Sequence, residues 1–277
     1  MNDSALNLVD RGRGDPALVL IHGFTCDLSS WKEQLTGISN SHRCVAIDLP
    51  GHGASADSPE ATIEALAAAA NATLDGLQLD EAVLVGHSMG CRVISEMASQ
   101  SPQRVRGVVY VDGSIVSRSD VDAAVKGAAE KLDRIGMQAF IRHLYEGFWV
   151  PGTPAAAREF VMAGMPGIRM DFAKKLWPNV VRWDGSRVRP VLAGISVPAL
   201  VIQSTTLDTD LNRASLLPGQ STPWVDAVTQ ALGDVTVAVI EGVGHFPMLE
   251  APQKTNDVIL EFVRRLGKDS GGGQHTV

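Results

Sequence analysis

The chain has 277 residues, of which 45% are hydrophobic and 20% are charged, with 27 glycines and 14 prolines. This is the composition of an ordinary globular protein with a sizeable core, and it excludes collagen, coiled coil and a largely disordered chain. The formal net charge of −7 (24 Lys and Arg against 31 Asp and Glu) argues against a broad surface for binding nucleic acid or anionic membrane.

Short aliphatic runs recur along the chain, separated by longer stretches with helical patterning. Most of the runs are apolar at every position, which is typical of strands buried on both faces of a parallel sheet. The runs lie at 6–9, 17–21, 44–47, 82–85, 105–111, 198–202 and 235–240. The clearest helices between them are predicted at 60–77, 88–100 and 252–266. We therefore predict a doubly wound α/β fold with a mostly parallel sheet of about seven strands, in which ligands bind beyond the carboxyl ends of the strands.

One stretch, residues 114–195, interrupts this alternation. No convincing strand is predicted in it, only helical segments such as 119–135, 137–148 and 155–165. The stretch holds eight of the fourteen aromatic residues and four of the eight methionines. We expect an inserted helical cap, part of whose aromatic and methionine side chains line an apolar pocket.

This insert divides the core of the fold in the sequence. The α/β core is expected at 1–113 and 196–266, and residues 267–277 are expected to form a disordered tail. Three widely spaced cysteines offer neither a disulfide framework nor a zinc-ligand spacing, and they fit a reducing compartment. With no signal peptide and no apolar run long enough to cross a membrane, the sequence predicts a cytoplasmic protein.

The segment Gly86-His87-Ser88-Met89-Gly90 follows one predicted strand and begins a predicted helix. A strand that turns directly into a helix forces the serine into a strained backbone conformation, and larger side chains at the glycine positions would collide with neighbouring elements. The serine then stands at a helix N-terminus, whose free N–H groups favour a developing negative charge. The pattern predicts a nucleophile elbow with Ser88 as the nucleophile.

His245 lies in a glycine-rich loop after the last predicted strand, at the same carboxyl edge of the sheet as Ser88. This position suits the general base of a Ser, acid, His triad in that chain order. The other histidines form no cluster with metal-ligand spacing, so no metal site is predicted.

Three further segments accompany the elbow in a characteristic order: 22–24 after the second strand, 48–55 after the third, and 242–247 around His245. Together they resemble the α/β-hydrolase superfamily, in its cofactor-free group of capped serine hydrolases such as esterases and lactonases. The resemblance extends from about Leu6 to Leu266, apart from the helical insert.

This resemblance implies several site residues. The backbone N–H groups of Phe24 and Met89 would form an oxyanion hole. His87, Phe148 and Trp149 are expected in the substrate pocket, and no cofactor is expected.

The triad acid is less clearly marked. In the family it usually follows the strand predicted here at 198–202, in a loop reading Gly-x-x-Asp. In this chain Asp208 stands one residue late for that pattern if Ser204 takes the place of the glycine. Asp208 is the expected acid, with Asp210 and Asp112 as alternatives, the last because some relatives place their acid after the preceding strand.

The resulting functional hypothesis is a serine hydrolase that cleaves a small to medium, largely apolar ester or lactone through an acyl-enzyme on Ser88. Its partner is then a small-molecule substrate. Two alternatives remain: hydrolysis of carbon–carbon bonds in ring-cleavage products by the same triad, and a small-molecule receptor on the same fold. Turnover of an ester distinguishes the receptor from the enzymes.

Overall fold

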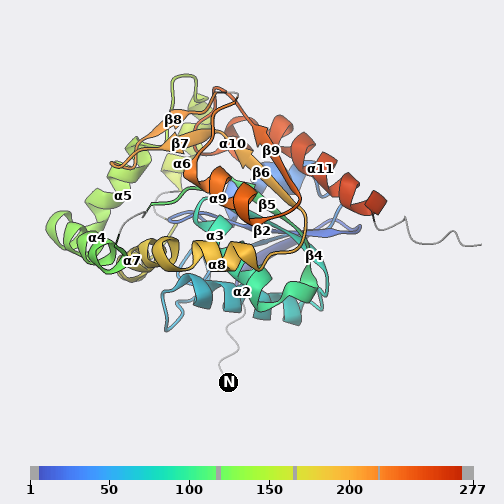
Figure 1. The fold of residues 1–277 in the computed structure, drawn as a ribbon, viewed down its shortest axis with the longest axis horizontal. Coiled ribbons are helices and arrows are strands. Elements are labelled where there is room, and N and C mark those ends of the chain that lie inside the picture. The colour runs from blue at the N-terminus through green and yellow to red at the C-terminus, as the bar shows by residue number, and fades with distance from the viewer. Residues whose placement is uncertain (1–5, 117–119, 165–166, 218, 270–277) are drawn as a thin grey trace, which may run out of the picture.

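The computed structural model of the chain describes residues 6–116, 120–164, 167–217 and 219–269. Its central sheet is built from β1 (Leu8–Arg11), β2 (Ala17–Ile21), β3 (Cys44–Ile47), β4 (Ala82–His87), β5 (Val105–Val111), β6 (Ala199–Gln203) and β9 (Val235–Val239). The strands lie in the order β1-β3-β2-β4-β5-β6-β9 (Figure 1). β1 pairs antiparallel with β3 and the other neighbouring pairs are parallel. The predicted doubly wound, mostly parallel α/β sheet of about seven strands is confirmed.

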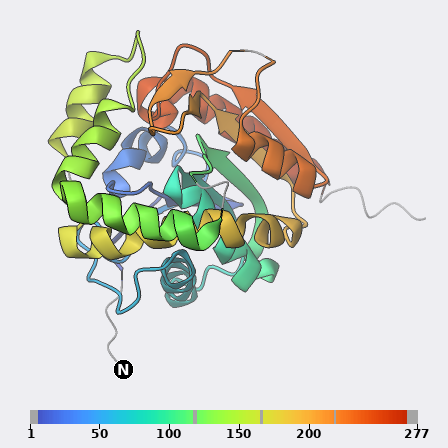
Figure 2. The ribbon, with the colours of Figure 1, turned by 60° about the vertical axis from the view of Figure 1, so that its left-hand side comes forward.

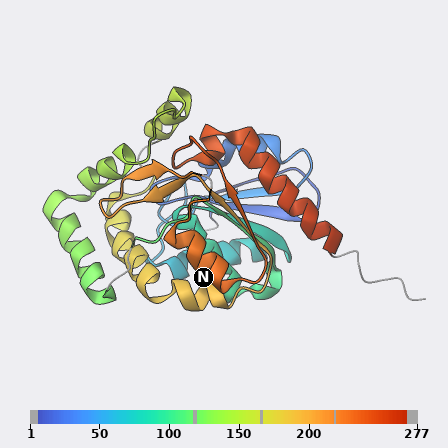
Figure 3. The ribbon, with the colours of Figure 1, turned by 45° about the horizontal axis from the view of Figure 1, so that its top comes forward.

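Helices cover both faces of this sheet, and its inner strands are therefore buried at nearly every position. The helices of the core are α1 (Lys32–Gly37), α2 (Ile63–Gly76), α3 (Met89–Gln100), α9 (Pro223–Ala231), α10 (Pro247–Glu250) and α11 (Pro252–Asp269), with short 3₁₀ turns η1 (Leu28–Trp31) and η2 (Pro102–Arg104). α1 and α11 lie together on one face, and α2 and α3 lie on the other (Figure 3). None of the helices among the described residues is long and apolar enough to cross a membrane.

The described residues of the segment between β5 and β6 form helices and the loops that connect them. The segment comprises α4 (Val121–Ile135), α5 (Met137–Glu146), α6 (Ala155–Ala163), α7 (Met170–Ser186) and α8 (Val188–Ala193). α4 packs along α7, and these helices lie beside the carboxyl edge of the sheet (Figure 2). A buried ion pair joins this segment to the core: Arg92 Nε of α3 lies 2.7 Å from Asp184 Oδ1 of α7.

Two parts of the structure differ from the sequence-based expectation. The chain between β6 and α9 contains a hairpin of β7 (Thr205–Leu207) and β8 (Arg213–Ser215), for which the sequence predicts no strands. At the other end of the chain, α11 continues to Asp269, so residues 267–269 are helical rather than the start of a tail. The rest of the expected tail lies outside the described residues.

Candidate active site

Ser88 occupies the tight turn between β4 and α3, with φ 53° and ψ −113°. A positive φ is rare for a residue other than glycine and stores strain in the backbone. A Cβ atom built on Gly86 would lie 2.3 Å from the carbonyl oxygen of Gly90, and one on Gly90 would lie 2.4 Å from that of Ile21. Both positions therefore require glycine, and the backbone has the strand-to-helix elbow that the motif predicts.

His245 follows β9 and faces Ser88. Its Nε2 lies 3.0 Å from the Ser88 Oγ, and its Nδ1 lies 2.7 Å from Oδ2 of Asp112. The His245 backbone is also fixed, because its N–H donates to the carbonyl of Phe148 and its carbonyl accepts from Nε2 of His87 at 2.8 Å. With Nδ1–H donated to the carboxylate, Nε2 is free to accept the serine proton.

The carboxylate beside His245 belongs to Asp112, so the expectation of Asp208 as the acid is wrong. Asp112 directly follows β5, adopts φ 45° and has no exposed surface. Its Oδ1 accepts the backbone N–H groups of Ser204 and Thr205 at 2.9 and 2.8 Å, and its Oδ2 accepts the Thr205 hydroxyl at 2.6 Å. The residues after β6 thus supply donors that hold the acid of the neighbouring strand.

Asp208 and Asp210 lie on the exposed turn of the β7–β8 hairpin. The Asp208 carboxylate accepts the backbone N–H groups of Asp210 and Asn212, both at 2.9 Å, and so stabilises the turn. The carbonyl of Asp210 contacts Nε2 of His143 at 2.9 Å. Because the hairpin begins at Thr205, it carries both carboxylates away from His245.

Arg213 of β8 is a further charged neighbour of the acid. Its Nη1 lies 3.0 Å from Asp112 Oδ2 and 2.8 Å from the Thr205 hydroxyl, and its side chain is 4% exposed. Burial opposes ionisation of Asp112, but Arg213 and His245 outweigh it and hold the pKa of this carboxyl well below its usual range. Burial, together with the charge of Arg213, lowers the pKa of His245 to about 4. At neutral pH the imidazole is therefore uncharged and able to accept a proton.

The loop after β2 passes directly beside Ser88. A Cβ atom built on Gly23 would lie 3.1 Å from the Ser88 Cβ. The loop is fixed by His22, which contacts the Gly23 carbonyl through Nδ1 at 2.8 Å and accepts the Leu49 N–H at Nε2. Phe24 follows in this loop, and Met89 begins α3, where backbone N–H groups lack partners within the helix. That the N–H groups of these two residues form an oxyanion hole stays a prediction, and this arrangement is consistent with it.

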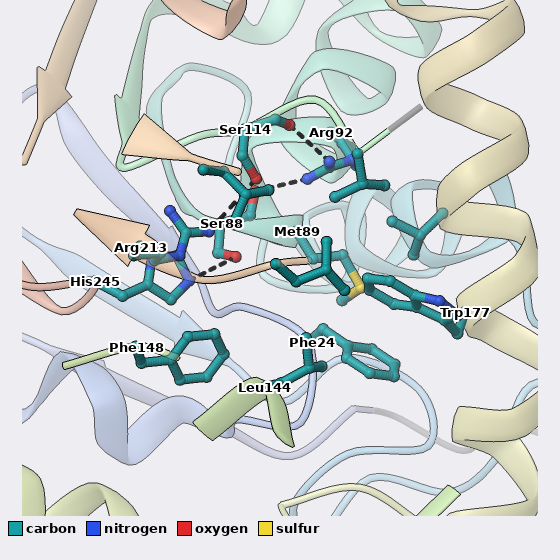
Figure 4. A pocket seen from close by; sticks show the side chains of 14 residues that line it. Phe24, Ser88, Met89, Arg92, Ser114, Leu144, Phe148, Trp177, Arg213 and His245 are labelled. Atoms are coloured by element: carbon teal, nitrogen blue, oxygen red, sulfur yellow. Dashed lines mark hydrogen bonds between the residues drawn. The ribbon is translucent and has the colours of Figure 1, made fainter. Parts of the chain in front are cut away.

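A pocket opens above Ser88 and has about 470 Å³ of empty volume, including the part open to solvent. It is lined mainly by apolar side chains, and its polar and charged side chains, those of Ser88, Arg92, Ser114, Arg213 and His245, gather on one side (Figure 4). The lining residues are Phe24, Ser88, Met89, Arg92, Ser114, Val116, Leu144, Phe148, Trp177, Val180, Leu207, Leu211, Arg213 and His245. The helical insert, the hairpin and the core therefore all contribute to its wall.

Of the three residues expected in the pocket, Phe148 lines it, while His87 and Trp149 do not. His87 is buried beneath the site, and burial lowers its pKa well below the ordinary value, so it is a neutral support for His245. Trp149 stacks on Phe246 with 5.7 Å between ring centroids. Arg213 could not be predicted from the sequence, because short polar strands give only a weak signal.

Known proteins match this sequence over almost its whole length. It is 26% identical over 261 residues to the dihydrolipoyllysine-residue acetyltransferase component of the acetoin cleaving system of Pseudomonas putida, which covers 92% of this chain and 65% of that protein. It is 23% identical to the esterase YbfF of Escherichia coli and 24% identical to a 2-(acetamidomethylene)succinate hydrolase of Mesorhizobium japonicum, with over nine tenths of each chain covered. The chain thus spans less than two thirds of the first relative's length.

Solved structures with the same fold include hydrolases. An esterase from Thermogutta terrifontis has a TM-score of 0.78 at 23% identity and covers 94% of this chain and 93% of its own. The enol-lactonase of Burkholderia xenovorans has a TM-score of 0.74 at 22% identity, with 94% and 96% covered. The model of the alpha/beta hydrolase family matches residues 18–258. The sheet, the elbow and this match together show that the chain belongs to the alpha/beta hydrolase family of enzymes.

Proposed function

We propose that the protein is a serine hydrolase that cleaves a small to medium, largely apolar carboxylic ester or lactone. The observation that carries this proposal is the continuous chain of contacts from Ser88 Oγ through the His245 imidazole to Asp112, at 3.0 and 2.7 Å. The apolar wall of the pocket above Ser88 supports an apolar substrate. The named esterase and enol-lactonase relatives are consistent with this class.

In the acylation step, the Ser88 oxygen forms a bond to the substrate carbonyl carbon while its proton moves to Nε2 of His245. The carbonyl electron pair moves onto oxygen, where the N–H groups of Phe24 and Met89 would stabilise it. When the carbonyl re-forms, the bond to the alkoxy leaving group breaks, and His245 gives that oxygen the proton.

In deacylation, water takes the place of the alcohol. His245 accepts a proton from water as the hydroxyl oxygen bonds to the acyl carbon, and then returns a proton to the Ser88 oxygen as the acyl–serine bond breaks. The products are a carboxylic acid and regenerated enzyme. Asp112 orients the imidazole throughout and stabilises its charged form.

The nucleophile is tested with a fluorophosphonate probe, which should label the wild-type protein and fail to label Ser88→Ala. The substrate class is tested with p-nitrophenyl esters of increasing chain length, a lactone panel and a ring-cleavage dienoate. We expect turnover of short to medium esters or lactones, lost in Ser88→Ala. Turnover of the dienoate alone would contradict the ester proposal, and labelling without any turnover would favour a receptor.

We further propose that the helical insert, residues 114–195, is a cap that selects the substrate. Val116, Leu144, Phe148, Trp177 and Val180 of this segment line the pocket. The reacting groups themselves come from the core, so changes in the insert are expected to alter which substrates fit rather than the chemistry.

A further inference from the structure

Arg213 and His245 contact the same carboxylate oxygen of Asp112. Nη1 of Arg213 lies 3.0 Å from Asp112 Oδ2, the same atom that lies 2.7 Å from His245 Nδ1. In a triad without such a cation, the carboxylate acts on the imidazole alone and favours its protonated form. Here one carboxylate oxygen contacts both the Arg213 guanidinium and the His245 imidazole, so its charge is divided between them.

The β7–β8 hairpin holds Arg213 in this place. Leu207 pairs with Arg213 across the hairpin, and the Arg213 N–H donates to the carbonyl of Gly147 at 3.0 Å. Among the described residues, Nε of Arg213 has no hydrogen-bond acceptor, although it is buried. Burying a guanidinium with an unsatisfied N–H is unfavourable, so packing alone does not explain an arginine at this position.

The other charged or titratable groups around His245 carry less weight. Arg92 of α3 is paired through two hydrogen bonds with Asp184. His87 of β4 is neutral, since burial lowers its pKa well below the ordinary value. Glu250 of α10 accepts the backbone N–H groups of Gly244 and Phe246, which flank the imidazole residue, rather than the ring itself. Arg213 is the cation in direct contact with the acid.

We propose that Arg213 is a positioning residue that offsets the charge of Asp112 and also repels the imidazolium directly, so that His245 remains an unprotonated base in acidic solution. The guanidinium withdraws part of the carboxylate charge from the imidazole and repels a proton on it. The low pKa of His245, about 4, agrees with this geometry. The effect on the reaction rests on the proposed function, whereas the effect on the imidazole does not.

The test is a titration of the His245 imidazole followed by NMR in the intact protein without substrate. The neutral variant is Arg213→Met, and Arg213→Lys retains the charge. Arg43→Met is the matched control, because it removes the same charge from an ion pair with Asp10 at the opposite edge of the sheet. We expect the titration midpoint to rise by at least about one pH unit in Arg213→Met and to stay near the wild-type value in Arg213→Lys and Arg43→Met.

A second comparison is needed because Arg213→Met leaves the Asp112 carboxylate buried without its cation and could prevent folding. Asp112→Asn and the double variant Asp112→Asn with Arg213→Met differ only in the arginine, and the midpoint should be higher in the double variant. Equal midpoints in both comparisons would overturn the proposal.

If esters are turned over, the acid limb of kcat/KM should move with the NMR midpoint in the variants that retain Asp112. Absence of ester turnover, with the NMR shift present, would count against the proposed substrate and leave the role of Arg213 intact.

Discussion

The carboxylate of Asp112 is buried among donors from three segments of the chain, and this fixes its direction toward His245. Replacing it with Asn removes the charge that stabilises the imidazolium and allows the wrong imidazole tautomer. We expect Asp112→Asn to lower kcat by about 10⁴-fold. Asp208→Asn is the matched control, because its carboxylate lies exposed on the hairpin turn. The measurement is ester turnover, with thermal melting to check that each variant is folded. A larger loss of activity in Asp208→Asn than in Asp112→Asn would contradict this assignment.

Sequence patterns were informative about individual residues where backbone geometry restricts the choice. The glycines around Ser88 mark the elbow because side chains there would meet the backbone of neighbouring elements. The acid was harder to predict, because a carboxylate can reach His245 from the end of either β5 or β6. Which position carries the acid depends on where hydrogen-bond donors surround the carboxylate. Around Asp112 these donors include the backbone N–H groups of Ser204 and Thr205, and a sequence pattern does not show where backbone groups point.

At the scale of elements, α7 brings Trp177 and Val180 to the pocket. Trp177 packs against Phe24, with 5.3 Å between ring centroids. Trp177→Ala should widen the pocket and shift chain-length preference toward longer esters, measured as ratios of kcat/KM across the p-nitrophenyl series. Trp149→Ala is the control, because Trp149 lies outside the pocket. A change in preference that was equal in both variants would indicate general loss of packing, which for Trp→Ala amounts to about 3–5 kcal/mol.

The ion pair between Arg92 and Asp184 joins α3 of the core to α7 of the insert. Asp184 also accepts the backbone N–H of Val116 at 2.6 Å, and both charged side chains are buried. Asp184→Ala leaves Arg92 buried without its partner, so unfolding by urea should show a loss of about 3–5 kcal/mol. Asp122→Ala removes the partner of Arg182 in an exposed pair and should barely change the midpoint. Equal effects of the two variants would contradict this prediction.

The elements that sequence patterns predicted well are those with strong hydrophobic periodicity. Strands β2, β3 and β5 begin and end at the predicted residues. Helix α7 was not predicted, because Pro178 lies inside it and proline removes a helical hydrogen bond. The β7–β8 hairpin was missed because its three-residue strands are too short for alternation to be visible.

For the whole molecule, four buried histidines link stability to pH. Burial lowers the pKa of His22, His52, His87 and His245 in the folded state below the ordinary 6.5. As pH falls through 6.5, the unfolded chain takes up protons that the folded chain does not, so stability decreases by up to about 1.4 kcal/mol per pH unit for each histidine. Thermal melting should therefore show a falling Tm between about pH 6.5 and pH 4, where His245 itself begins to protonate. A Tm that stayed constant over this range would contradict the prediction.

The insert leaves the core immediately after Asp112, which links the pocket wall along the chain to the carboxylate proposed as the triad acid. Ser114 lies two residues beyond Asp112 and lines the pocket, and the carbonyl of the intervening Gly113 is held by Gln203. A graft of a foreign helical segment for engineering new selectivity must therefore keep residues 112–116 and supply an acceptor in place of Asp184 for the Val116 N–H. In evolutionary terms, recombination at this junction would exchange the part of the pocket wall that the insert supplies and would change the surroundings of Asp112 in the same event.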